Sequence, residues 1–217
     1  MRAGNFTRFA DWRFVHRARL DVVPLNGCRR FGSGDKRCRR CGYKNETLPH
    51  VLCHCPPHQK AATLRHNNVQ NRLLKAIPPA LGVVTVNKKV LGSTSNLRPD
   101  IVIRDESQKR VIMIDVTCPF ENGSDSFVVF EARAEKRQTY DAICSDLRRS
   151  GYQVFSDAFI IGALGSWDPK NERILNICHI NKRYALLMRK LMVSDTIKWS
   201  RDIYVEHVSG VQQYTDR

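Results

Sequence analysis

Apolar residues at helical spacing predict a helix over residues 61–77. Pro78 and Pro79 follow this stretch and end the helix, because proline lacks the N–H group that the next turn needs. The apolar positions of the pattern are Leu64, Val69, Leu73, Leu74 and Ile77. We place a domain boundary at the two prolines.

Short apolar runs after this boundary predict β-strands over residues 83–86, 100–104 and 111–117. The polar residues 105–109 separate the last two runs, so these two strands are expected to pair as a β-hairpin. A charged helix is then predicted over residues 127–149, with Gly151 just past its end. Its candidate core positions are Phe130, Ala134, Ala142, Ile143 and Leu147.

The rest of the chain predicts a strand over residues 152–163, a helix over residues 171–192 and a weaker helix from Ser194 onward. A hairpin, a helix, a strand and further helices in this order are typical of an α/β fold with helices flanking a sheet. Residues 6–20 alternate apolar and aromatic residues with arginine and form a basic lead-in to the cysteine cluster. We therefore expect four segments: a basic lead-in (1–36), a cysteine-rich module (37–60), a linking helix (61–79) and the α/β domain (80–217).

The charge of the chain is strongly positive and unevenly distributed. Lys and Arg number 36 against 21 Asp and Glu, which gives a formal net charge of +15. Residues 1–60 carry thirteen Lys and Arg against four Asp and Glu, or +9 of that total. A polyanionic partner is expected, contacted mainly by the front of the chain. The alternative is a solvated basic surface that only keeps the protein soluble.

The sequence indicates a soluble, intracellular protein that makes no membrane contact. No run approaches about eighteen apolar residues, and the N-terminus alternates arginine with aromatic residues where a signal peptide needs an apolar core. Five of the eight cysteines lie between Cys28 and Cys55. Such clustering beside histidine favours a metal site over a disulfide framework.

The cysteine-rich module has the ligand spacing of a structural zinc site. Cys38 and Cys41 form a Cys-x2-Cys pair, and His50 and Cys55 follow. Two sulfurs from one tight turn, with Gly42 after it, can reach one ion. Three thiolates and one imidazole suit tetrahedral zinc, which would supply much of the folding energy of so short a segment.

The fourth zinc ligand is open to other assignments from the sequence alone. The residues that could replace a ligand are Cys28, Cys53 and His54. We prefer Cys55 because Val51 and Leu52 then form the apolar side of a short helical turn between the last two ligands.

Two acidic residues are placed so that they could share a divalent ion. Asp100 introduces the first strand of the predicted hairpin, and Asp115 interrupts the apolar run of the second. These positions can face each other in an antiparallel pair, and a charge in such a strand needs a partner or a metal. Converging carboxylates suit Mg²⁺ or Mn²⁺, which can activate a water for phosphodiester hydrolysis.

These motifs together resemble those of the PD-(D/E)XK restriction-like nucleases. The Cys-x2-Cys pair with Glu46-Thr47, His50 and Cys55 is similar to one branch, the C-terminal region of site-specific non-LTR retrotransposon polyproteins that insert into ribosomal RNA genes. The resemblance covers most of the chain. It implies a restriction-endonuclease-like mixed sheet flanked by helices, preceded by a CCHC zinc knuckle that contacts nucleic acid. It also implies that the nuclease nicks target DNA and that the exposed 3′-hydroxyl primes reverse transcription by another part of the polyprotein.

The resemblance assigns roles to particular residues. Asp100 and Asp115 match the metal-binding acids, but Thr117 stands where many restriction enzymes have their lysine. In the retrotransposon branch the cation comes from the following helix in a Lys-x-x-Lys-Tyr pattern, which Lys136 and Tyr140 match. Lys136 would then stabilise charge at the attacked phosphate, with Tyr140 in support.

One position of that pattern is different in this chain. Thr139 stands where the branch has its second lysine, and Arg133 or Arg137 could replace the missing charge. Spare acidic residues nearby are Glu131, Glu135 and Asp141.

Two hypotheses follow: a metal-dependent endodeoxyribonuclease, or a nucleic-acid-binding module of the same fold without nuclease activity.

Target DNA and element RNA are the expected partners, and a nuclear location is expected. The basic residues expected to contact nucleic acid are Arg37, Arg39, Arg40, Lys44 and Arg98. Reverse transcriptase would belong to another part of the polyprotein, since the sequence lacks a Tyr-x-Asp-Asp motif. Oligomeric state is left open.

Overall fold

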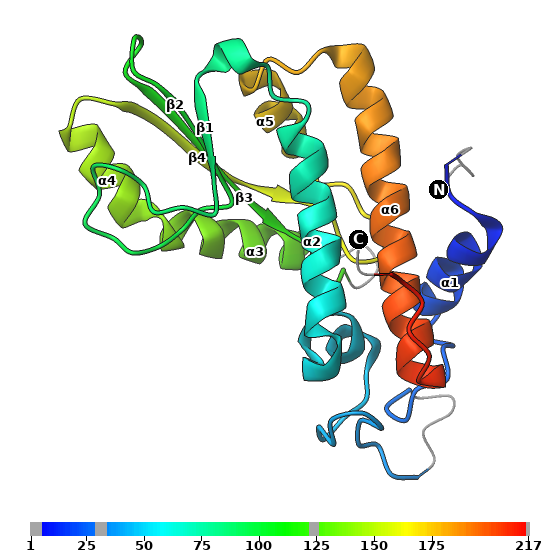
Figure 1. Ribbon diagram of the computed structural model, residues 1–217. Coiled ribbons are helices and arrows are strands. Elements are labelled where there is room, and N and C mark those ends of the chain that lie inside the picture. Colours follow the sequence, from blue (N-terminus) through cyan, green and yellow to red (C-terminus); the bar gives the residue numbers. More distant parts are fainter. Residues whose placement is uncertain (1–5, 29–33, 122–125, 216–217) are drawn as a thin grey trace.

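The protein is built around a four-stranded mixed sheet with helices packed against it (Figure 1). The computed structural model describes residues 6–28, 34–121 and 126–215. The strands lie in the order β1 (Val83–Val86), β2 (Ile101–Asp105), β3 (Arg110–Thr117) and β4 (Gln153–Ile160). The helices are α1 (Phe9–Arg19), α2 (Gln59–Leu74), α3 (Ser126–Thr139), α4 (Asp141–Arg149), α5 (Asn171–Ile177) and α6 (Lys182–Ser209), with short turns η1 (His50–His54), η2 (Pro56–His58) and η3 (Pro79–Leu81). The predicted α/β architecture with a mixed sheet is confirmed.

Strands β2 and β3 form the predicted hairpin. They run antiparallel with Ile101 opposite Ile114, and β1 pairs antiparallel with the other edge of β2. Strand β4 runs parallel to β3, as expected for a strand that returns after a helical crossover. Side chains alternate between the faces of a strand, so Ile114 points to one face of the sheet while Met113 and Asp115 point to the other.

Each face of the sheet has its own apolar core. On one face, α2, α5 and α6 cover the isoleucines of β2 and β3. On the other face, Val111 and Met113 pack against Ile143 and Leu147 of α4. Burial of one such side chain contributes roughly 1.5–3 kcal/mol, so both faces hold helices in place.

The segment predicted as one helix over residues 127–149 is two helices, α3 and α4. Tyr140 lies between them with φ −99° and ψ 8°. Ile143 and Leu147 are buried as predicted, whereas Ala134 and Ala142 are exposed. The predicted core position at residue 130 has a side chain outside the part of the chain that the structure describes. The sequence has no glycine or proline at this break. The break instead coincides with a tertiary contact, the hydrogen bond of Tyr140 to Asp115.

The stretch predicted as one helix over residues 171–192 is also interrupted. His179 takes a positive φ of 52°, and the Asn181 side chain accepts hydrogen bonds from the first backbone N–H groups of α6. Asparagine is favoured at helix N-termini for this reason. The weaker stretch from Ser194 onward continues α6, which has 28 residues. No helix in the described ranges, α6 included, is both long and apolar enough to span a membrane.

The basic lead-in contains a helix, α1, that belongs to the core. Phe14, Val15 and Ala18 lie in one buried cluster with Ile197 and Ile203 of α6. Figure 1 shows α1 beside α6, with the cysteine-rich module at the end of α2 and α6 that lies away from the sheet. The alternation of arginine with aromatic residues is therefore that of a helix with one buried side.

A buried ion cluster attaches α3 to β4. The guanidinium of Arg133 pairs with Asp157 of β4 and, at 2.6 Å, with Asp168. Asn171 Oδ1 lies 3.4 Å from the same guanidinium, and all four side chains are buried. The charges in this cluster depend on one another, because an unpaired buried charge is strongly unfavourable.

Replacing Arg133 with alanine is expected to lower the free energy of unfolding by about 3–5 kcal/mol, because two carboxylates then remain buried without their cation. Urea unfolding at pH 7, followed by circular dichroism, measures this change. Arg137→Ala, at an exposed position of the same helix, is the matched control and should change stability by less than about 0.5 kcal/mol. Equal stability of the two variants would show that the cluster does not hold α3 in place.

Candidate functional site

The cysteine-rich module begins with a tight turn that brings two thiols together. The N–H of Gly42 donates to the carbonyl of Cys38, and the N–H of Cys38 donates to the carbonyl of Tyr43, both at 2.8 Å. Gly42 has a φ of 72°, which would strain a residue with a side chain. The glycine after the Cys-x2-Cys pair is thus required by the turn that aims Cys38 and Cys41 at one point.

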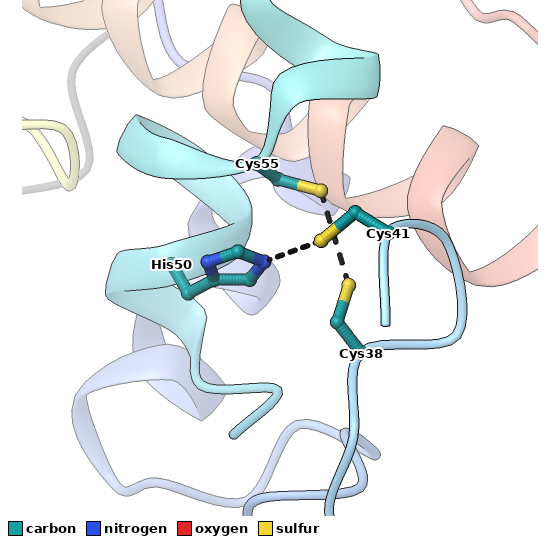
Figure 2. Close-up of side chains that lie close together, drawn as sticks. All are labelled: Cys38, Cys41, His50 and Cys55. Carbon is teal, nitrogen blue, oxygen red and sulfur yellow. Dashed lines mark hydrogen bonds between the residues drawn. The ribbon is translucent and has the colours of Figure 1, made fainter. Parts of the chain in front are cut away.

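The other two predicted ligands lie at the two ends of the turn η1. His50 opens this turn and Cys55 follows it, while Val51 and Leu52 are buried on its apolar side, as predicted. Figure 2 shows the side chains of Cys38, Cys41, His50 and Cys55 gathered around one point. Their ligand atoms all lie within 4.8 Å of one another.

The distances within this group suit a tetrahedral metal ion. Cys38 Sγ is 3.9 Å from Cys55 Sγ, and Cys41 Sγ is 3.3 Å from His50 Nε2. Bond lengths of about 2.3 Å to sulfur and about 2.0 Å to nitrogen place two sulfurs about 3.8 Å apart, and a sulfur and a nitrogen about 3.5 Å apart. The four side chains could therefore hold a metal ion such as zinc.

The residues that could have replaced a ligand have other surroundings. Cys28 Sγ lies 2.9 Å from the carbonyl oxygen of Asp21, and Cys53 Sγ lies 3.8 Å from that of Cys118. Neither cysteine, nor His54, belongs to a group of three potential ligand atoms in the described part of the chain. The structure thus brings the four predicted ligands together without them.

A buried chain of hydrogen bonds lies beside the four ligands. His207 of α6 has its Nε2 2.8 Å from Glu46 Oε1 and 4.0 Å from Cys38 Sγ. Its Nδ1 lies 2.9 Å from His58 Nε2, and Arg39 adds a charged hydrogen bond to Glu46. The sequence analysis missed these hydrogen bonds, because Glu46 and His207 are 161 residues apart.

Burial and hydrogen bonding set the protonation of Glu46 and His207. Burial alone would raise the pKa of Glu46, but hydrogen bonds from Arg39, the Asn26 N–H and His207 lower that pKa to about 2. Burial lowers the pKa of His207 to about 4, although the Glu46 carboxylate opposes this. At neutral pH an anionic Glu46 therefore accepts a hydrogen bond from a neutral His207.

Three predicted nuclease residues meet on the face of the sheet that α3 covers. Asp115 is only 5% exposed. Tyr140 Oη donates to Asp115 Oδ1 at 2.6 Å, and Lys136 Nζ lies 2.8 Å from Asp115 Oδ2. The break between α3 and α4 places the tyrosine, and the last turn of α3 places the lysine.

The charge of Asp115 controls the protonation of both partners. Burial and the hydrogen bond to Asp115 raise the pKa of Tyr140, so the phenol stays a neutral donor. Burial alone would lower the pKa of Lys136, but its contact with Asp115 raises it, so the lysine stays cationic. The Lys136 side chain is 36% exposed, which leaves it accessible to a ligand from solvent.

Asp100 directly precedes Ile101, the first residue of β2, and Ile101 pairs with Ile114, the residue before Asp115. Its Oδ2 accepts the N–H of Val116 at 2.7 Å and lies 3.0 Å from His66 Nε2. His66, on α2, was missed by the sequence analysis, because a histidine on the polar side of a helix gives no signal by itself. Asp100, Asp115 and His66 do not form a group of three ligand atoms within 4.8 Å in the described ranges.

Thr139, the position that departs from the lysine pattern, is bonded to its own helix, and the charged residues near it differ in their surroundings. Thr139 Oγ1 donates to the carbonyl of Glu135 on its own helix at 2.8 Å. Of the two arginines expected to replace the missing charge, Arg133 is engaged in the buried ion cluster and Arg137 is exposed. The spare acidic residues are also exposed, namely Glu131, Glu135 and Asp141.

The basic residues expected to contact nucleic acid are all exposed: Arg37, Arg39, Arg40, Lys44 and Arg98. Two of them also hold the module together. Arg39 pairs with the buried carboxylate of Glu46, and Arg40 Nε donates to the carbonyl of His207 at 2.8 Å. These two arginines therefore have a structural role besides any contact with phosphate.

Comparison with known proteins identifies homologues of this chain, although no protein-family model matches it. It is 25% identical over 182 residues to "Retrovirus-related Pol polyprotein from type-1 retrotransposable element R2" of Popillia japonica, and 26% identical over 183 residues to the polyprotein of the same name from Nasonia vitripennis. These alignments cover 82% and 79% of this chain, but only 37% and 17% of the two polyproteins. The predicted relationship to a non-LTR retrotransposon polyprotein is confirmed, and the chain spans well under half the length of these relatives.

The purified protein is expected to contain one equivalent of zinc that Cys55→Ser loses and Cys53→Ser keeps. The reason is that Cys55 lies in the group of four ligands, whereas Cys53 contacts a backbone carbonyl. Elemental analysis by mass spectrometry after dialysis measures the metal. If Cys55→Ser keeps its zinc and Cys53→Ser loses it, the fourth zinc ligand is Cys53 and not Cys55.

Protonation of His207 is expected to destabilise the fold in acid. Its pKa lies at about 4 in the folded protein, below the ordinary value of 6.5, so the unfolded chain binds more protons between these values. The free energy of unfolding should therefore fall as the pH drops from 6.5 toward 4, by up to about 3 kcal/mol. Urea unfolding of zinc-loaded wild type and His207→Gln across this range tests the effect. Parallel profiles would show that another group is responsible.

Proposed function

We propose that this chain is the endonuclease region of a non-LTR retrotransposon polyprotein and nicks target DNA in a divalent-metal-dependent reaction. The observation that carries the proposal is the convergence of Lys136 and Tyr140 on the buried carboxylate of Asp115, beside Asp100. The R2 polyproteins found as homologues support a retrotransposon role. A restriction-endonuclease-like arrangement, with one acid at the start of β2 and one near the end of β3, is part of the proposal.

Asp100 and Asp115 would hold the metal ion. Their oxygens are hard ligands of the kind that Mg²⁺ and Mn²⁺ prefer, and two anions on adjacent strands repel unless a cation reduces their charge. An ion bound there supplies Lewis-acid chemistry and lowers the pKa of a water ligand. Because Lys136 already contacts Asp115 Oδ2, the lysine and the ion would share this carboxylate.

The other residues of the site act on the phosphate and on the geometry. Lys136, cationic and accessible, stabilises negative charge that develops on the attacked phosphate. Tyr140 holds Asp115 in one orientation through a 2.6 Å hydrogen bond, so the carboxylate meets the ion without reorganising.

The cysteine-rich module and its basic surroundings would bind nucleic acid. We propose that the four Cys and His ligands hold zinc, and that the net charge of +15 draws the protein to target DNA and to element RNA. A nuclear location follows from a chromosomal target. The nicked strand would then prime reverse transcription by another part of the polyprotein.

A nucleic-acid-binding module without activity is the second candidate. The departures at Thr117 and Thr139 favour it, because both positions lack the lysine that related nucleases use there. The two candidates differ in whether divalent metal produces nicks, so one assay separates them.

Metal-dependent nicking of supercoiled plasmid is expected with Mg²⁺ or Mn²⁺, and Asp115→Asn should lower its rate about a thousandfold or more. Lys136→Ala should lower the rate about 10² to 10³-fold, because it removes one charged group at the phosphate. Asp141→Asn, an exposed acid next to Tyr140, is the matched control and should cut like wild type.

If the wild type binds DNA with a steep salt dependence but nicks it with neither Mg²⁺ nor Mn²⁺, the chain is a nucleic-acid-binding module without nuclease activity. Equal rates for Asp115→Asn and Asp141→Asn would place any observed activity outside the proposed site.

A further inference from the structure

We propose that the outer face of α1 binds single-stranded DNA, whose unpaired bases stack on an aromatic stripe formed by Phe9, Trp12 and His16. This surface lies outside the cysteine-rich module and outside the carboxylate site. The inference rests on the proposed function for the choice of DNA. It goes further by assigning a binding surface for an opened strand to a helix that has no part in the cleavage chemistry.

The rings of the aromatic stripe lie in a row along one side of α1. Their spacing of three and then four residues places them on the same face of the helix. The ring centroids of Phe9 and Trp12 lie 5.9 Å apart with an interplanar angle of 22°, and those of Trp12 and His16 lie 5.4 Å apart with an angle of 6°. An unpaired base can add to such a stack, because every base offers a flat π face.

The aromatic stripe faces solvent, opposite the side of α1 that packs on α6. Phe9 is 73% exposed and Trp12 is 37% exposed, whereas Phe14 and Val15 are buried in the core that α1 shares with α6. Figure 1 shows α1 on the side of α6 that lies away from the sheet. A ring as exposed as that of Phe9 adds little to the core, so folding does not account for it.

Arginines flank the aromatic stripe on both sides. Helical spacing places Arg13 and Arg17 along one edge of the stripe and Arg19 along the other. All three arginines are exposed, and Arg13 has no hydrogen-bond or ion-pair partner in the described ranges. Rings that stack bases, beside cations that meet phosphates, are the combination that single-stranded nucleic acids bind.

A hollow between α1 and α6 lies on the Arg13 side of the stripe. It has a volume of about 130 Å³, and its lining includes Arg13, Arg17 and Arg201. Arg201 pairs with Asp202 at 3.0 Å, and Arg17 donates to the carbonyl of Val22 at 3.3 Å. These contacts hold two of the guanidinium groups in place next to the rings. A strand whose bases stack on the stripe can therefore place a backbone phosphate in this hollow.

The composition of α1 indicates which features of a strand it can recognise. The helix contains no Ser, Thr, Asn or Gln, the neutral side chains that often read base edges or a ribose 2′-hydroxyl. We therefore expect binding that does not depend on base sequence and gains nothing from a 2′-hydroxyl. A duplex keeps its bases stacked inside, so it would meet the arginines without using the aromatic stripe.

The simpler explanation is that the aromatic stripe only stabilises α1 through contacts between neighbouring rings. Tyr184 of α6 is 40% exposed, close to the value for Trp12, so Tyr184→Ala is the matched control for the loss of an exposed ring. Trp12→Phe is the conservative variant, because it keeps a ring for stacking and removes the indole.

The test is titration of the zinc-loaded protein into labelled oligo(dU) of about 20 nucleotides, a length that exceeds most single-strand sites. Fluorescence anisotropy without added Mg²⁺ or Mn²⁺ measures binding without cleavage. Phe9→Ala and Trp12→Ala should each raise the dissociation constant about fivefold or more, and Tyr184→Ala should change it less than about twofold. Affinity for a duplex of the same length should stay within about twofold in all three variants, because their charge is unchanged.

Tryptophan fluorescence gives a second readout that a structural role would not produce. Bound oligo(dU) should quench this fluorescence in wild type, and most of the quenching should be absent in Trp12→Phe. The affinity of Trp12→Phe for oligo(dU) should remain within about threefold of wild type, because a phenyl ring still stacks.

Three results would overturn the inference. Equal oligo(dU) affinities for wild type, Phe9→Ala and Trp12→Ala would show that the stripe binds no bases. An equal loss of duplex and single-strand binding in the alanine variants would show that the stripe only supports the fold. Tighter binding of oligo(U) than of oligo(dU), with the difference lost in Trp12→Ala, would make RNA the partner of this surface.

The outcomes also separate this surface from the proposed nuclease. Metal-dependent nicking that Asp115→Asn abolishes, together with unchanged oligo(dU) binding in Phe9→Ala and Trp12→Ala, overturns the surface and leaves the nuclease standing. Single-strand binding that depends on Trp12, in a protein that never nicks DNA, supports the surface and overturns the nuclease.

Discussion

The burial of one charge, that of Asp115, is the constraint on which the α/β part of the structure depends. A carboxylate inside a strand with buried neighbours costs several kcal/mol unless it is paired and hydrogen-bonded. Lys136 and Tyr140 supply both partners, one from the last turn of α3 and the other from the break after it. Helix α3 must therefore lie at one fixed position over the sheet, and Arg133, one turn earlier, secures it to β4.

Helix α2 connects the two candidate sites through adjacent residues. Arg65 contacts the turn η1, which carries His50, while His66 contacts Asp100 of the carboxylate site. The start of α2 at Gln59 lies seven residues before His66, or about 10 Å along the helix. The same helix therefore contacts both the cysteine-rich module and Asp100. The two sites are therefore parts of one structure, although each has its own ligands.

Much of the positive charge is used inside the protein as well as on its surface. Arg65 and Arg133 are buried, and Arg39 pairs with the buried carboxylate of Glu46. The positive excess lies at the front of the chain, but the count of arginines does not show which of them face a partner. That distinction depends on buried acceptors, whose positions come from distant parts of the chain.

The sequence by itself determined the features that local spacing controls. Spacing along a turn, a strand or a helix decides which side chains share a face, and this placed the hairpin and the four Cys and His ligands. The lysine and tyrosine that accompany the two acids were assigned by the resemblance to restriction-like nucleases. Tertiary structure alone decided the break at Tyr140 and the pairing of His66 with Asp100 and of His207 with Glu46. These pairs join residues 34 and 161 positions apart. Only the packing of helices on the sheet and on the cysteine-rich module sets such distances, and local spacing carries no information about them.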